Sequence, residues 1–171
     1  MPTLHSTPAP TQAPNDEQRC QQLAAEAVLA TLCGRAPARV QQVSLVDGIR
    51  YGLAPDPAAL ALNRGLMEDL VMVGLAGTVA LELAGYEWPD LALAEAAALE
   101  LLRRSLSDPG EQAVAAAYLQ VLRARTAATL RRSWTEVQVV AAGLLEHGEL
   151  GAEELGHRIS CAQHLRGKTL N

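Results

Sequence analysis

The sequence predicts a mainly α-helical protein with one short β-hairpin. Ala (31) and Leu (28), both strong helix formers, are the most frequent of the 171 residues, and Phe is absent. Cap and turn signals divide the chain into helix-length segments, and one Asp-Gly pair between β-branched residues indicates a hairpin. We therefore expect one helical domain over residues 16–165, between a disordered tail at 1–15 and a short tail at 166–171.

The first elements after the proline-rich tail are a helix and the hairpin. Asp16 is placed to cap the helix, and Gly34 is placed to end it. Residues 39–53 contain two β-branched runs on either side of Asp47-Gly48, a pair that favours a type I′ turn with positive φ at both positions. We expect these to be the only strands in the chain.

The remainder of the chain is expected to be helical, because prolines preceded or followed by Asp supply start signals and glycines supply ends. The expected helices begin near Asp56, cover 65–84, 89–106 and 108–147 with a bend near Ser133, and end with 152–165. The 65–84 helix is apolar on nearly all sides and should be central. Gly74 and Gly77 within it allow a close approach of another backbone, which we expect inside the domain.

Composition excludes several classes of function. A net charge of −5 and 3% aromatic residues argue against nucleic-acid binding, which needs a basic surface. The longest uncharged apolar stretch, 70–81, is short of the about 20 residues of a membrane span. Three cysteines without a Cys-x-x-Cys pair fit a reducing, cytoplasmic setting. No phosphate-binding loop and no Ser-His-Asp set is recognisable, which argues against nucleotide hydrolysis and serine-type catalysis.

Four segments follow one another in a characteristic order. They are Gln22-Leu-Ala-Ala-Glu26-Ala on the first helix, the glycine-containing helix segment 74–83, the helix start Pro89-Asp90-Leu91 and the segment 143–155, GLLEHGELGAEEL. With the hairpin between the first two, this order resembles the protease domain of the FtsH-type AAA zinc metalloproteases. The resemblance covers 16–165 and implies the helical fold of that domain, without the family's ATPase domain and membrane segment.

The zinc motif of that family is degenerate in this chain. The family has His-Glu-x-x-His on the first helix, where two His bind zinc and Glu is the general base. Gln22, Leu23 and Glu26 stand at these positions, and Asp90 matches the third ligand. The resemblance therefore implies a catalytically inactive module for protein interaction or oligomerisation, with no cofactor and with an FtsH-type AAA protease as an implied partner.

Two sets of residues leave a metal-dependent alternative open. Glu26 and Asp90 would hold a hard cation if they converged, and are otherwise a surface acid and a helix cap. His157, Cys161 and His164 share one face of the last helix and carry donors that suit zinc, although such residues near a chain end are commonly exposed without a ligand. In this alternative the chain is a peptidase or hydrolase with non-standard ligands.

Self-association is the expected mode of interaction. Because the helices have few aromatic residues for a hot spot, a stable interface would have to be broad, about 1,200 Å² or more. A homodimer is the simplest symmetric solution. The expected faces are the helical stretch 111–146 and the C-terminal helix, and the arginines of 123–132 are expected to pair with nearby acids.

Overall fold

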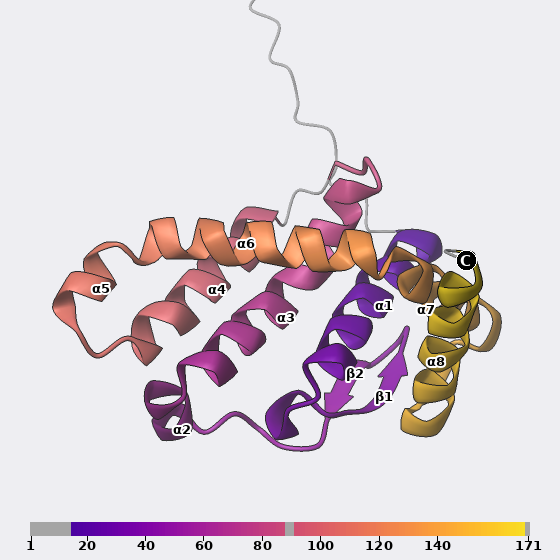
Figure 1. Ribbon diagram of the computed structural model, residues 1–171, viewed down its shortest axis with the longest axis horizontal. Helices are drawn as coiled ribbons and strands as arrows, with labels where there is room; N and C mark the ends of the chain where they lie inside the picture. The colour runs from indigo at the N-terminus through magenta and orange to yellow at the C-terminus, as the bar shows by residue number, and fades with distance from the viewer. Residues whose placement is uncertain (1–14, 88–90, 170–171) are drawn as a thin grey trace, which may run out of the picture.

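The computed structural model describes residues 15–87 and 91–169 and confirms a mainly helical fold with a small antiparallel sheet. In Figure 1, α6 lies across α3 and α4, and the sheet and α8 lie at the right-hand end. The elements are α1 (Asp16–Cys33), the 3-10 turn η1 (Ala36–Ala38), β1 (Val40–Ser44), β2 (Gly48–Tyr51), α2 (Pro57–Leu62), α3 (Arg64–Leu83), α4 (Leu91–Ser105), α5 (Pro109–Ala113), α6 (Ala115–Arg132), α7 (Trp134–His147), β3 (Glu149–Gly151) and α8 (Ala152–Thr169). No helix in this described part is long and apolar enough to cross a membrane.

The ends of α1 show how local sequence sets the first helix. The N-cap is Asn15 and not Asp16: the Asn15 side chain accepts a hydrogen bond from the Gln18 backbone at 2.8 Å, and the Gln18 side chain accepts one from the Asn15 backbone at 3.2 Å. This reciprocal arrangement is a capping box. The helix ends where Gly34 takes a φ of +64°, as the sequence predicts.

The predicted hairpin is confirmed, but its turn is of another type. Gly48 has a φ of +79°, whereas no residue other than glycine has a positive φ in the described chain, which excludes a type I′ turn at Asp47-Gly48. Ser44 pairs with Gly48 across a three-residue connection. The Ser44 hydroxyl accepts hydrogen bonds from the backbone of Val46 (3.2 Å) and Asp47 (3.3 Å), which satisfies the donors of this longer turn.

A third strand was not expected from the sequence. β3 pairs antiparallel with β1, so the order in the sheet is β2-β1-β3. The pairing is reinforced by a hydrogen bond of 2.8 Å from Gln42 Nε2 to Glu149 Oε2. β3 has three residues and none of them is β-branched, so its sequence does not predict a strand. The strand forms because these residues pair with β1.

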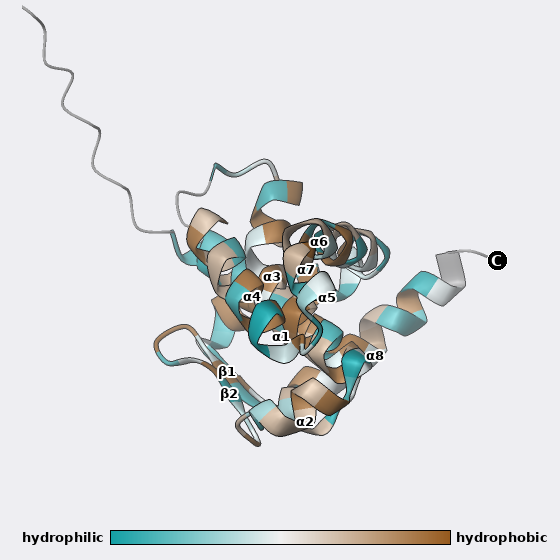
Figure 2. Cartoon of the chain, turned by 90° about the vertical axis from the view of Figure 1, so that its left-hand side faces the viewer, coloured by the Kyte–Doolittle hydropathy of each residue, from teal (hydrophilic) through white to brown (hydrophobic). Residues whose placement is uncertain are grey.

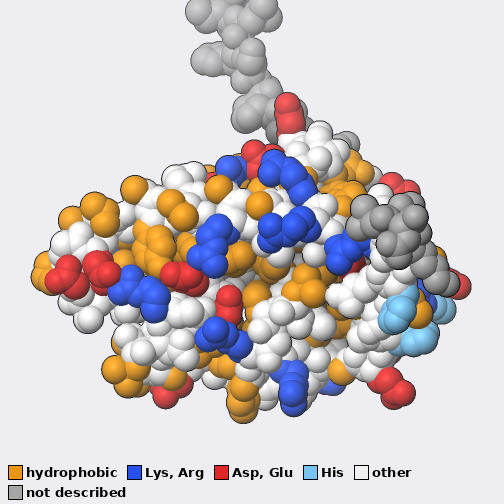
Figure 3. Space-filling model, in the orientation of Figure 1, with side chains coloured by type: hydrophobic (Ala, Val, Ile, Leu, Met, Phe, Trp, Pro, Cys, Tyr) orange, Lys and Arg blue, Asp and Glu red, His pale blue; other side chains and the backbone are white. Residues whose placement is uncertain are grey.

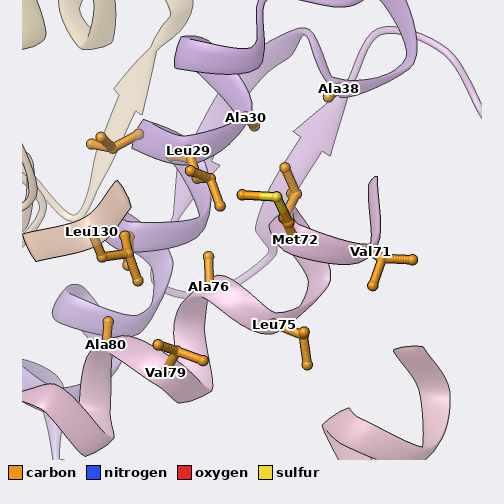
Figure 4. Close-up of a cluster of buried hydrophobic side chains, with 14 of the residues drawn as sticks. Leu29, Ala30, Ala38, Val71, Met72, Leu75, Ala76, Val79, Ala80 and Leu130 are labelled. Carbon is orange, nitrogen blue, oxygen red and sulfur yellow. The ribbon is translucent and has the colours of Figure 1, made fainter. Parts of the chain in front are cut away.

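The core lies around α3, which packs against α1, α4 and α6, while α1 also packs against α7. Figure 4 shows Leu29 of α1, Ala76 of α3 and Leu130 of α6 directed into the same buried layer, and all three are at most 1% exposed. Figure 2 shows hydrophobic segments where these helices lie together. Each such leucine contributes about 1.5–3 kcal/mol by leaving water.

The expected helix over 108–147 is divided into α5, α6 and α7 by breaks at Val114 and Ser133, the second of which coincides with the predicted bend. The last helix continues to Thr169, beyond its expected end at residue 165. Two arginines of α6 pair with acids of neighbouring helices, Arg125 with Glu68 of α3 at 2.7 Å and Arg123 with Glu95 of α4 at 2.9 Å. These ion pairs attach α6 to α3 and α4.

Candidate functional site

The three residues of α1 that match the zinc motif have three different environments. Gln22 packs on α3 at Gly77, where a Cβ atom would lie 2.6 Å from Gln22 Cγ. Leu23 is a core residue with 3% exposure. Glu26 is only partly buried and lines a pocket between α1, α3 and β2. Of the three, Glu26 alone is available to a ligand in that pocket.

These residues do not fit the zinc ion of the FtsH-type site. Leu23 has no donor atom, and Gln22 Oε1 accepts a hydrogen bond of 3.3 Å from Arg19 Nη1. Asp90, the match to the third ligand, lies outside the described residues. Within the described residues no three His, Cys, Asp or Glu side chains lie close enough to hold a metal ion. Glu26 is thus the one carboxylate at the motif positions of α1.

Glu26 is paired with a phenol from the sheet. Tyr51, at the end of β2, pairs with Val40 of β1, and its hydroxyl donates a hydrogen bond of 2.8 Å to Glu26 Oε1. Burial raises the pKa of Glu26, and the hydrogen bond from Tyr51 and the charge of Arg19 oppose that shift. Burial and the adjacent carboxylate raise the pKa of Tyr51, so the phenol stays protonated and remains a donor.

The Glu26–Tyr51 pair lies in an apolar groove, which we call the Glu26 groove. It consists of a pocket of about 190 Å³ between α1, β2, α3 and α4 and a second of about 180 Å³ between α3 and α4. Both pockets are lined by Leu70, Gly74 and Leu101. The first pocket is also lined by Pro37, Leu53, Pro55 and Val73. The second pocket is also lined by Val71, Ala94, Ala97 and Ala98. Of the described residues that line the groove, only Glu26 is charged.

The two glycines of α3 have separate roles. Gly77 makes the close helix contact that the sequence predicts inside the domain, against Gln22 of α1. Gly74 is exposed, and a Cβ atom there would meet no heavy atom within 4 Å. Because Gly74 lines both pockets, its missing side chain keeps the groove open between them.

The C-terminal candidates lie on the exposed side of α8. Cys161 Sγ is 3.5 Å from His157 Nε2, so the structure brings these two together. His164 Nδ1 lies 2.7 Å from the carbonyl oxygen of Ser160, and this contact directs the ring to the backbone. The three residues therefore form a pair and a separate histidine in place of one cluster.

Two important residues were not identified from the sequence. Tyr51 follows Ile49 by two positions in a strand, a pattern that predicts a shared face but gives no sign of a carboxylate partner. Glu136 is fully buried, and among the described residues its carboxylate accepts no hydrogen bond and has Arg166 Nη1, at 3.1 Å, as its ion-pair partner. Its spacing of four from Val140, on the apolar face of α7, is the signal that could have marked it as buried.

No protein-family model matches the chain, and no curated protein matches it. The geometry of the Glu26 groove is therefore the basis for the functional argument.

Proposed function

We propose that the chain is a catalytically inactive, protease-like interaction module that binds an extended apolar segment of a partner protein in the Glu26 groove. The observation that supports this most is a single carboxylate among uncharged walls. Apolar walls favour apolar side chains of a ligand, because both leave water on binding. The carboxylate adds a preference for one Lys or Arg in the same segment, since a charge in such surroundings interacts strongly with its opposite.

The sheet supports an extended conformation for the bound segment. Within the described residues β2 pairs only with β1, so the outer backbone edge of β2 is available beside Tyr51. Extended ligands bind such edges by main-chain hydrogen bonds, with alternate side chains directed into pockets. A pocket of about 190 Å³ accommodates one long side chain of this kind.

Absence of peptidase chemistry is part of the proposal. Leu23 stands where the FtsH-type motif has its general base, and leucine accepts no proton. A cytoplasmic setting, self-association and an FtsH-type AAA protease as partner belong to the same proposal. The cysteine content supports the cytoplasmic setting, the helical surfaces expected to associate support self-association, and the resemblance to the FtsH-type family supports the protease partner.

The experiment measures binding of synthetic peptides of about ten residues with alternating Leu and Ser and one central Lys, Gln or Glu. We expect the Lys peptide to bind best and Glu26→Gln to reduce its affinity about tenfold, equivalent to 1.4 kcal/mol. Glu146→Gln, which removes an exposed charge at the end of α7, is the matched control and should bind as the wild type does.

Amide chemical shifts locate the binding site in the same titrations. We expect changes in β2, the following residues to Pro55, and the facing turns of α3 and α4. Equal affinity for the Lys and Glu peptides, or shifts confined to other elements, would contradict the proposal.

A further inference from the structure

α8 has an imidazole and a thiol side by side on its exposed face. Leu155, Ile159 and Ala162 are buried on the other side of the helix, at 4% exposure or less. Cys161 and His157 are exposed. Figure 3 shows histidine side chains at the right-hand end of the molecule, where Figure 1 has α7 and α8. This face is therefore open to a ligand or to another protein.

The distance between the two donor atoms fits a shared metal ion. A tetrahedral zinc ion with a Zn–S bond of about 2.3 Å and a Zn–N bond of about 2.05 Å separates the two donors by about 3.6 Å. The distance between Cys161 Sγ and His157 Nε2 is 3.5 Å. The spacing of four residues on one helix thus places the two donor atoms about as far apart as two ligands of one tetrahedral zinc ion.

We propose that two copies of this chain share one zinc ion, each supplying His157 and Cys161. Closed structural zinc sites have four protein ligands, and a set of two thiolates and two imidazoles is a common one. One chain contributes two donors, and no third His, Cys, Asp or Glu lies within reach among the described residues. A second copy related by a two-fold axis completes the set.

The surface of α8 allows the second helix to approach. Gly156 and Ser160 lie one position before the two ligands, and a Cβ atom at Gly156 would meet nothing within 4 Å. A helix of 18 residues offers an area of roughly 27 Å by 10 Å, about 300 Å² per partner, which is less than a standard interface. The zinc ion therefore supplies stability that the helix contact alone lacks.

Cys161 is the cysteine suited to this role. Cys20 is buried, and burial raises the pKa of its thiol. Burial, with the neighbouring Asp69, raises the pKa of Cys33 to about 11. On zinc binding each Cys161 thiol releases its proton to solvent and each His157 binds as neutral imidazole. Two Zn–S and two Zn–N bonds replace the bonds between the hydrated zinc ion and its water ligands, which return to solvent, and no redox change occurs.

The inference rests on the self-association part of the proposed function and is independent of the Glu26 groove, which α8 does not line. The test uses the full chain with a phosphine reductant, which prevents a Cys161 disulfide. Added Zn²⁺ should double the 18.1 kDa mass measured by light scattering, with one metal per two chains, and a chelator should reverse the change. Co²⁺ should give the charge-transfer absorption of a thiolate ligand.

Cys161→Ser and His157→Ala should each abolish the zinc-dependent dimer and the cobalt absorption. His147→Ala, which removes a histidine of α7, is the matched control and should leave both unchanged. A mass unaffected by zinc, a full metal equivalent bound by a monomer, or a zinc-dependent dimer of Cys161→Ser would overturn the inference. A dimer that forms without metal would also overturn it, while supporting self-association by another surface.

Discussion

Replacement of Gly77 by Ala tests the contact between α1 and α3 that positions Glu26. The new methyl group would lie 2.6 Å from Gln22 Cγ and 3.2 Å from the Gln22 carbonyl oxygen. The side chain of Gln22 can rotate away, but its backbone belongs to α1 and moves only with the helix. We therefore expect Gly77→Ala to displace α1 from α3.

The magnitude follows from two opposing effects. Ala in place of Gly in a helix stabilises the folded state by about 0.5–1 kcal/mol. Overpacking of a tight contact costs about 1–3 kcal/mol. The free energy of unfolding should thus fall by up to about 2.5 kcal/mol for Gly77→Ala and rise by about 0.5–1 kcal/mol for Gly74→Ala, where the added methyl meets no atom. The two variants should therefore differ by the overpacking cost of about 1–3 kcal/mol.

Urea denaturation followed by circular dichroism measures both variants, and their melting temperatures should differ by roughly 2–12 °C for a chain of this length. Gln22→Ala in the Gly77→Ala background removes the nearest clashing atom and should recover part of the loss. Equal stability of Gly77→Ala and Gly74→Ala would show that the contact with Gln22 does not restrict position 77.

Two further predictions concern the carboxylates of the partly buried Glu26 and the fully buried Glu136. Folding raises the pKa of Glu26 above the ordinary value of 4.5 for a glutamate. The free energy of unfolding should therefore fall as the pH rises above 4.5 and become constant above the pKa of the folded state. Denaturation measured over this pH range should show no such fall for Glu26→Gln. Arg166→Leu leaves the buried Glu136 carboxylate without its ion-pair partner and should cost on the order of 3 kcal/mol, whereas the double variant Glu136→Leu/Arg166→Leu should recover most of it in a double-mutant cycle.

Elements specified by local chemistry could be predicted from the sequence. The end of α1 at Gly34, the Pro57 and Pro109 helix starts and the apolar α3 follow from capping, fixed proline φ and periodicity. The hairpin was predicted for the same reason, but its turn type was wrong, because the Ser44 hydroxyl supports a longer connection that the Asp-Gly pair does not indicate.

Elements and contacts that depend on distant residues could not be predicted. β3 exists through its pairing with β1, and its own three residues give no strand signal. The motif on α1 points to Glu26, but its partner Tyr51 is 25 positions away and is brought to it by the packing of the sheet on α1. The Glu26 groove forms where α1, β2, α3 and α4 pack together, and the periodicity of the sequence does not predict the space beside Gly74.

Charge reversal at Glu26 shows whether this carboxylate selects the charge of the bound peptide. The measurement compares the dissociation constants of the Lys and Glu peptides for the wild type and for Glu26→Lys, after circular dichroism shows that the variant is folded. We predict that the wild type binds the Lys peptide at least about tenfold more tightly and that Glu26→Lys prefers the Glu peptide. An unchanged preference in Glu26→Lys would contradict the account, because the Glu26 carboxylate would then have no part in recognition.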